Sequence, residues 1–190
     1  MSIVGVLLAA GAGSRMGWPK ALTHADDGSS WLATAIDALL GGGCDHVIVV
    51  LGAQADRALE LVPTDRPVQV TVADDWGEGL SASLRAGLAA AETTEARVAV
   101  ITLVDLPELP AKAVARLLGE GDTRADAATV RQAVFGERPG HPVVVGREHW
   151  AGLTAWAHGD QGARGYLREH GAERVDCSDL WSGRDVDSLS

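Results

Sequence analysis

A short stretch near the amino terminus, LAAGAGSRMGWPKAL (residues 8–22), gathers residue types that bind phosphate. Gly11 and Gly13 allow backbone N–H groups to approach phosphate oxygens closely, and Arg15 and Lys20 add two positive charges. Fixed cations beside a glycine loop suit a triphosphate that is polarised and cleaved. We therefore predict a triphosphate-binding loop. The alternative is a plain strand-to-helix turn with two surface cations, although such a turn requires no particular lysine.

Two other phosphate loops fit this stretch less well. A Walker A loop requires Gly-Lys-Ser/Thr in sequence, but two residues separate Gly17 from Lys20, and Ala21 follows the lysine. A dinucleotide fingerprint requires glycine or alanine where Met16 stands, and an acidic residue after the second strand, where the chain reads LGAQ (51–54). The spacing therefore excludes Walker A and disfavours a nicotinamide dinucleotide site.

The composition limits the classes of protein to consider. The chain has 190 residues, of which 46% are hydrophobic, so we expect a single domain over residues 1–190. Its net charge of -10 and the lack of a basic block argue against nucleic-acid binding. No apolar run approaches the ~20 residues that cross a bilayer. Cys44 and Cys177 stand far apart, which fits a reducing compartment. We expect a cytoplasmic protein that binds neither nucleic acid nor membranes.

Elements that position the loop follow from the hydrophobic pattern. Short Val- and Ile-rich runs predict strands at 3–8, 46–52, 68–73 and 98–105, and helical spacing predicts helices at 31–43, 54–62 and 79–92. Beyond Pro110 we expect a helix at 111–119, strands within 126–135 and 141–146 around a GERPGH loop, and a helix at 161–171. This alternation predicts an α/β fold: a Rossmann-like, mostly parallel sheet with flanking helices in a three-layer α/β/α arrangement. The glycine loop then lies at a carboxyl strand end, where ligands bind in such sheets.

The same stretch resembles the signature L-A-(A/G)-G-x-(S/G)-x-R-M-G-x-x-K of the MobA/MocA-like nucleotidyltransferases, which activate the molybdenum cofactor. Further segments resemble this family in the same order: DDWGEGLSASLRAGL (74–88), LVDLPEL (103–109), GHPVVV (140–145), GDQGARGYL (159–167) and RDVDSLS (184–190). The resemblance covers nearly the whole chain and implies a fold like that of the nucleotide-diphospho-sugar transferases.

The resemblance also implies a reaction. The protein would transfer CMP from CTP to the terminal phosphate of molybdopterin and release pyrophosphate, with Mg²⁺ as cofactor. Arg15, Lys20 and Asp105 would be catalytic. Asp105 ends a predicted strand, which delivers its carboxylate to the edge of the sheet that carries the glycine loop; a turn-capping role before Pro107 is the alternative. Asp105 and Asp187 would hold the metal ion, with Asp185 as the alternative to Asp187.

Binding residues follow from the same resemblance. The nucleotide would contact Leu8, Ala9, Ala10, Gly11, Gly13, Ser14, Arg15, Lys20, Gly52, Ala53, Gly79 and Ser83. The acceptor would contact His141, Asp160, Gly162 and Arg164. Alanine at position 10 is typical of the cytidine-using branch, whereas the guanine-using branch usually has glycine. A helix cap for Ser83 and a merely hydrogen-bonded role for His141 are the plain alternatives.

Other functions remain open at this stage. A related enzyme would use GTP on the same cofactor, or would act on a sugar or polyol phosphate. A non-catalytic nucleotide-binding accessory factor for molybdoenzyme maturation is an alternative of another class, because THADDGSSW (23–31) departs from the family pattern and Asp187 lies close to the end of the sequence. A molybdoenzyme or its chaperone would be the partner that receives the product.

Overall fold

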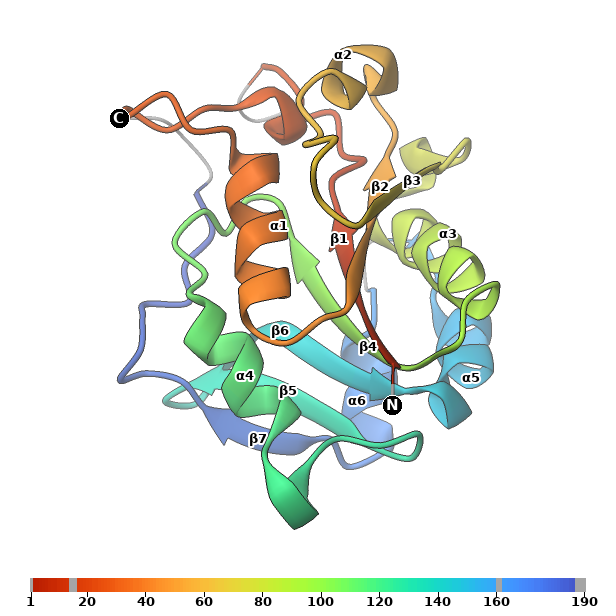
Figure 1. Cartoon of the computed structure of the whole chain (residues 1–190). Helices are drawn as coiled ribbons and strands as arrows, with labels where there is room; N and C mark the ends of the chain where they lie inside the picture. The colour runs from red at the N-terminus through yellow and green to blue at the C-terminus, as the bar shows by residue number, and fades with distance from the viewer. Residues whose placement is uncertain (1, 14–16, 160–161, 187–190) are drawn as a thin grey trace.

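A seven-stranded sheet is the centre of the computed structural model, which describes residues 2–13, 17–159 and 162–186 (Figure 1). Within these residues the strand order is β3-β2-β1-β4-β6-β5-β7. The strands are β1 (Ser2–Leu8), β2 (His46–Leu51), β3 (Val68–Val72), β4 (Ala96–Leu103), β5 (Val130–Phe135), β6 (Arg138–Gly146) and β7 (Glu173–Asp176).

Strand directions make this sheet mostly parallel, as the sequence predicts. β1 pairs in parallel with β2 on one side and with β4 on the other, β2 pairs in parallel with β3, and β5 with β7. Only β6 runs antiparallel to its described neighbours, β4 and β5. The chain therefore winds outward from β1 in both directions, and the carboxyl ends of β1 and β4 form the switch point at which such sheets bind ligands.

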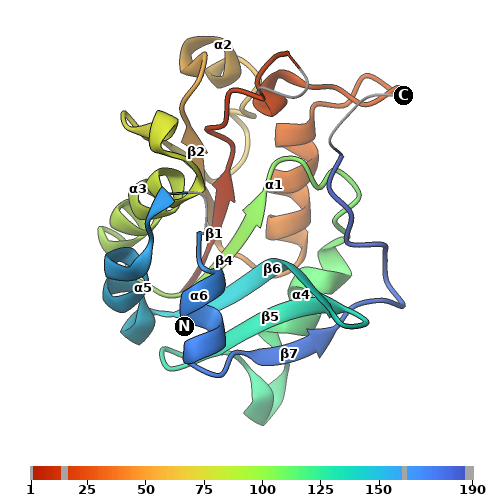
Figure 2. The same cartoon turned by 180° about the vertical axis from the view of Figure 1, so that it is seen from behind.

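Helices cover both faces of the sheet (Figures 1 and 2). One face carries α1 (Trp31–Gly41) and α4 (Ala111–Leu118), and the other carries α3 (Leu80–Glu92), α5 (Trp150–Trp156) and α6 (Arg164–Glu169). A short helix, α2 (Ala55–Leu59), follows β2. Alternate residues of β1 serve the two cores: Ile3 and Leu7 pack toward α1, and Val4 and Val6 pack toward α3. The predicted three-layer α/β/α arrangement is confirmed.

Element boundaries depart from the prediction mainly in the last third of the chain. Most of the predicted GERPGH loop is strand, because β6 begins at Arg138 and only a tight turn separates it from β5. α5 and β7 were not predicted. α5 has only seven residues, and tertiary burial of Trp150 and Leu153 holds it. β7 reads ERVD and lacks a continuous apolar run, since it is an edge strand.

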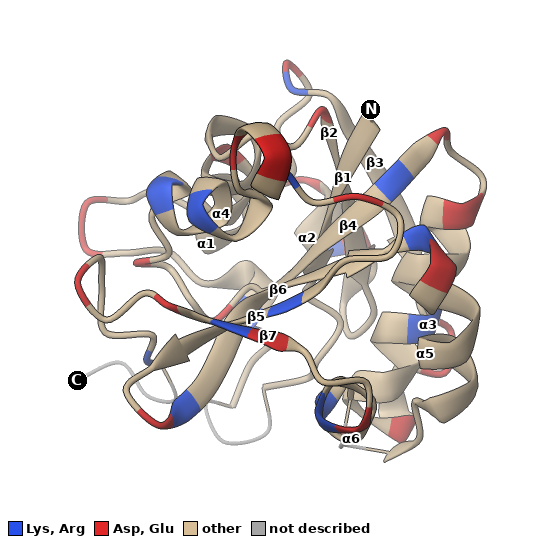
Figure 3. Ribbon diagram, turned by 90° about the horizontal axis from the view of Figure 1, so that it is seen from below, with Lys and Arg blue, Asp and Glu red and all other residues tan. Residues whose placement is uncertain are grey.

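Charged side chains are mixed over the surface. In the view from below, basic and acidic residues lie side by side on α3, α6 and the strands near β7 (Figure 3). No helix in the described part of the chain is long and apolar enough to cross a membrane.

Candidate functional site

The loop after β1 and the turn after β4 meet at the switch point. Lys20 opens a short 3₁₀ helix, η1 (Lys20–Leu22), and its ammonium Nζ donates a 2.9 Å hydrogen bond to Oδ2 of Asp105. The two side chains are only 16% and 18% exposed. β4 ends at Leu103, so Asp105 lies in the following turn and not at the end of the strand as predicted. The structure thus brings together two of the three residues expected to be catalytic; Arg15 lies outside the described residues.

Asp105 is a partly buried carboxylate with one unused oxygen. Burial raises its pKa, the hydrogen bond and charge of Lys20 oppose this rise, and the negative charge of Asp185 adds to it. Its Oδ1 is buried and has no hydrogen-bond partner among the residues that the structure describes. Such an orphaned oxygen in a polar site is a ready ligand for a hard divalent cation, which prefers carboxylate oxygens.

The chain near Asp185 lies against the Asp105 turn. The backbone N–H of Val186 donates to the carbonyl of Asp105 at 3.0 Å. Asp185 is close enough for its charge to act on both Asp105 and His141. The other candidate, Asp187, lies outside the described residues. In the part of the chain that is described, Asp185 is therefore the carboxylate placed to work with Asp105.

The glycine loop is shaped by its own backbone. Gly13 has φ 63°, and a Cβ at this position would lie 1.9 Å from the carbonyl oxygen of Trp18. The N–H of Gly17 donates to the carbonyl of Gly13, and the indole of Trp18 donates to Thr23 Oγ1 at 3.3 Å. Gly11 is exposed, and a Cβ there would meet no atom within 4 Å. The loop therefore needs glycine at 13 for its fold and leaves an open approach at 11; Ser14 is outside the described residues.

A second turn closes the same end of the sheet beside this loop. The N–H of Ala53 donates to the carbonyl of Ala10 at 3.0 Å, and that of Ala9 donates to Val50. A Cβ at Gly52 would lie 2.7 Å from Ala10 and from the Cβ of Trp76. Four of the residues expected to bind the nucleotide are buried: Leu8, Ala9, Ala10 and Ala53. A ligand would therefore contact mainly their backbone atoms.

The amino end of α3 adjoins this turn. Trp76 begins the 3₁₀ turn η2 (Trp76–Glu78), and Gly79, with φ 108°, is the N-cap of α3. Ser83 is 5% exposed, and Ser81, also buried, has an Oγ without a hydrogen-bond partner in the described residues. Gly79 and Ser83 thus lie in the region expected to bind the nucleotide. The structure also places Trp76 against Gly52.

Predicted acceptor residues line a cavity of about 700 Å³ between β6, α6 and the segment near Asp185. His141 and Arg164 are among its walls, and Gly162 packs against Leu80, which also lines it. Burial, with the charge of Arg164, lowers the pKa of His141 to about 4, although Asp185 opposes this. Asp160 lies outside the described residues. The complete lining is Leu80, Leu103, Leu106, Gln132, Arg138, Pro139, Gly140, His141, Val143, Ala163, Arg164, Gly165, Leu167, Arg168, Gly183 and Asp185.

Three cationic side chains, Arg138, Arg164 and Arg168, thus face one cavity in a chain of net charge -10. Arg168 follows Arg164 by one helical turn, a spacing that indicates a shared face once the helix is known. Arg138 is held by the carbonyls of Ser182 and Gly183. Neither Arg138 nor Arg168 is predicted from the sequence as a site residue. The cavity suits an anionic ligand.

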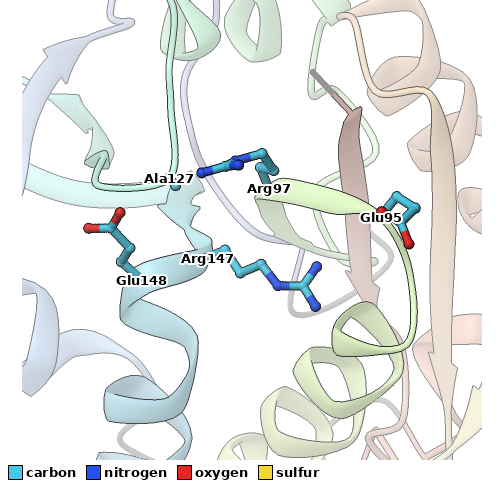
Figure 4. A pocket seen from close by; sticks show the side chains of 5 residues that line it. All are labelled: Glu95, Arg97, Ala127, Arg147 and Glu148. Carbon is cyan, nitrogen blue, oxygen red and sulfur yellow. The ribbon is translucent and has the colours of Figure 1, made fainter.

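A smaller hollow of about 380 Å³ lies at the opposite end of β4 (Figure 4). Arg147 reaches the carbonyls of Glu92, Thr94 and Ala96 there, and so ties the end of β6 to the turn before β4. Glu95, Arg97 and Glu148 complete the wall together with Ala127. These hydrogen bonds give Arg147 a structural role, so we assign no ligand to this hollow.

The chain is similar in sequence to a known protein family and to proteins of known name. Residues 5–175 match the family described as MobA-like NTP transferase domain. The chain is 36% identical to nicotine blue oxidoreductase of Paenarthrobacter nicotinovorans, over 98% of this chain and 93% of that protein. It is 37% identical to the bifunctional protein GlmU of Mycobacterium sp. strain KMS, over 72% of this chain and 28% of GlmU.

Solved structures agree on the fold. The crystal structure of Rv0371c from Mycobacterium tuberculosis H37Rv superimposes with a TM-score of 0.81 at 27% identity, covering 99% of this chain and 94% of that one. Rv0371c has also been solved in complex with manganese, and this structure gives a TM-score of 0.72 at 26% identity, covering 93% of this chain and 88% of that chain. The seven-stranded sheet of the described residues, with its flanking helices, matches the nucleotide-diphospho-sugar transferase-like α/β fold.

Proposed function

Because this chain belongs to the MobA-like NTP transferase family, we propose that it transfers CMP from CTP to the terminal phosphate of molybdopterin and releases pyrophosphate. One observation carries the catalytic part of this proposal. Lys20 and Asp105 meet at the switch point of the sheet, beside the glycine loop. The negative charge of Asp185 raises the pKa of Asp105, and Asp185 also lines the cavity that carries Arg138, Arg164 and Arg168. This arrangement supports adjoining sites for a triphosphate and a phosphate acceptor.

The reaction needs no protein nucleophile. An oxygen of the acceptor phosphate attacks the α-phosphorus of the nucleotide, a new P–O bond forms, and the bond to the β-phosphate breaks as pyrophosphate leaves with the negative charge. Catalysis is then a matter of holding the two phosphates in line and stabilising the leaving charge. Lys20 and Arg15 are the cations assigned to the triphosphate, and Arg164 is assigned to the acceptor phosphate.

The unpartnered oxygen of Asp105 supports a divalent cation at this residue. The manganese complex of Rv0371c supports the use of a divalent metal in general. Asp105 would hold the ion through its unpartnered Oδ1, with Asp185 or Asp187 as the second carboxylate. Mg²⁺ is usually bound through one or two carboxylates and completes its shell with phosphate and water, so a pair of aspartates beside a triphosphate suits it. When bound, such an ion neutralises charge on the phosphate oxygens.

CTP is the proposed nucleotide because of Ala10. This residue is 2% exposed, its carbonyl accepts a hydrogen bond from Ala53, and its Cβ lies 2.7 Å from the point where a Cβ at Gly52 would stand. The side chain thus helps to set the spacing of two turns that border the proposed base site. A glycine at position 10, typical of the guanine-using branch, would loosen that contact, so GTP is the alternative nucleotide.

Molybdopterin is the proposed acceptor, since GHPVVV and GDQGAR resemble the cofactor branch and the arginine-bearing cavity adjoins Asp105. A sugar or polyol phosphate is the alternative acceptor for the same chemistry. A molybdoenzyme or its chaperone would receive the product. Mass spectrometry of products formed from molybdopterin with Mg²⁺ and either CTP or GTP tests base and acceptor together, because each combination has its own product mass.

One relative favours a second candidate function. The similarity to nicotine blue oxidoreductase extends over 98% of this chain, so an oxidoreductase activity is the alternative. It predicts oxidation of NADH or NADPH with no pyrophosphate release. A non-catalytic accessory factor, in contrast, would bind a nucleotide and catalyse neither reaction.

A further inference from the structure

Arg85 of α3 joins three segments of the chain with one guanidinium group. Its Nη2 donates to Asp75 Oδ2 at 2.7 Å and to Glu78 Oε2 at 2.8 Å. Its Nη1 donates to the carbonyl of Ala157 at 3.0 Å. The side chain is 27% exposed. The planar, multiply donating guanidinium thus holds the η2 turn and the end of α5 on the same helix.

The η2 turn is the nucleotide side of this link. Asp75 and Glu78 bracket Trp76, whose Cβ closes on Gly52 beside Ala10. Gly79 ends the turn and caps α3. The two carboxylates that hold Arg85 therefore flank the residue that packs beside Gly52.

α5 and α6 are the acceptor side of the link. Ala157 is the C-cap of α5, and its own N–H donates to Leu153. The two helices are in close contact: a Cβ at Gly165 would lie 2.6 Å from Trp156 Nε1, and one at Gly152 would lie 2.9 Å from the Tyr166 hydroxyl. α6 carries Arg164 and Arg168 into the cavity. Because the two helices pack without spare space, a shift at Ala157 is transmitted to α6.

We propose that Arg85 is a positioning residue that transmits nucleotide binding at the η2 turn to α6, so that a bound nucleoside triphosphate strengthens the acceptor site around Arg164. This inference rests on the proposed function, because it takes the nucleotide to lie beside Gly52 and Gly79. Coupling of this kind is reciprocal: an acceptor bound at α6 also tightens nucleotide binding. Lysine at position 85 keeps the charge but cannot hold all three acceptors with the same geometry.

Hydrogen exchange at the amides of α6 tests the inference without any acceptor. Saturating CTP or GTP with Mg²⁺ is added to the wild-type protein and to Arg85→Gln and Arg85→Lys. We expect nucleotide to slow exchange in α6 by about fivefold or more in the wild type, which is a typical coupling factor. The slowing is expected to be lost in both Arg85 variants while nucleotide still raises their melting temperatures.

Arg66→Gln is the matched control, because Arg66 also pairs with two carboxylates, Asp37 and Asp65, at a distant surface. It should keep the full response of α6. A merely structural role for Arg85 would lower stability and speed α6 exchange equally with and without nucleotide. Wild-type protein that is stabilised by nucleotide but shows no slowing in α6, or Arg85 variants that slow as the wild type does, would overturn the inference alone. Failure of both nucleotides to bind the wild type would overturn the proposed function and the inference with it.

Discussion

The ammonium of Lys20 and the carboxylate of Asp105 lie 2.9 Å apart although the two residues are 85 positions apart in the sequence. Each is fixed by a different strand end, Lys20 by the loop after β1 and Asp105 by the turn after β4. The pairing leaves Oδ1 of Asp105 without a hydrogen-bond partner among the described residues. A carboxylate oxygen that is buried without a hydrogen bond lowers the stability of the fold, and such unpaired groups are typical of functional sites.

Asp105→Asn should separate activity from stability. We expect pyrophosphate release to fall on the order of 100-fold, because the substitution removes a charge aimed at the reacting phosphates. Burial raises the pKa of Asp105 above 3.8 despite Lys20, so its contribution favours the fold below pH 3.8 and is lost as pH rises through the raised value. At pH 7 the melting temperature of Asp105→Asn should therefore equal or exceed that of the wild type.

Asp179→Asn is the control for this substitution. It breaks an exposed ion pair with Arg116 and should change neither activity nor stability appreciably. Full activity of Asp105→Asn would show that Asp105 does not serve the metal or the phosphates.

Lys20→Met should move the pH dependence of the reaction as well as its rate. Lys20 lowers the pKa of Asp105 through its hydrogen bond and its charge, so its removal raises that pKa further. The acid limb of kcat/KM, which requires the ionised carboxylate, should shift to higher pH. Measurement of kcat/KM for CTP from pH 4 to 8 checks this, and an unchanged or lowered acid limb would contradict the assigned pairing.

Gly11→Ala should impair nucleotide binding without harming the fold. A Cβ at Gly11 or at Gly77 meets no atom within 4 Å, and neither residue has a positive φ, so both alanine variants should be as stable as the wild type or more stable by about 0.5 kcal/mol. Gly11 borders the proposed phosphate site, whereas Gly77 lies in the η2 turn away from the phosphates, so Gly11→Ala should raise KM for CTP by more than Gly77→Ala does. Equal KM values for the two variants would place the phosphates elsewhere.

His141 should make the protein acid-sensitive. Burial, with Arg164, lowers its pKa from 6.5 to about 4, so its contribution to stability is complete above pH 6.5 and is lost as pH falls through 4. The full loss corresponds to roughly 3 kcal/mol at the usual conversion of pKa shift to free energy. Urea unfolding at pH 7 and pH 4 should show a smaller loss for His141→Gln than for the wild type. Equal losses would mean that His141 is charged or exposed in the folded protein.

The sequence predicts the sheet and the position of the phosphate loop because both depend on local patterns. Runs rich in Val and Ile are typical of strands buried on both faces, so they predict the central strands. The phosphate-binding residue types at Gly11, Gly13 and Lys20 all lie within one loop, so their spacing is visible in the sequence. The family resemblance then brings Asp105 to the same place, and the family is confirmed.

Other features depend on tertiary contacts that no local pattern contains. α5 is held by the burial of Trp150, and β7 by an edge position beside β5. From the sequence, Arg85 looks like an ordinary surface arginine in a helix. Its role depends on acceptors in the preceding η2 turn and at Ala157, which is 72 positions away. Arg138 is expected in a loop and is found at the start of β6, facing the cavity.

Product analysis with pyrophosphate detection tests the central claim most directly. The protein is incubated with molybdopterin, Mg²⁺ and each of the four NTPs, and with NADH or NADPH in parallel, beside the Asp105→Asn variant. The account predicts pyrophosphate and CMP-linked molybdopterin from CTP, both lost in Asp105→Asn. Binding of nucleotide with no pyrophosphate from any NTP, or consumption of NADH or NADPH in its place, would contradict it.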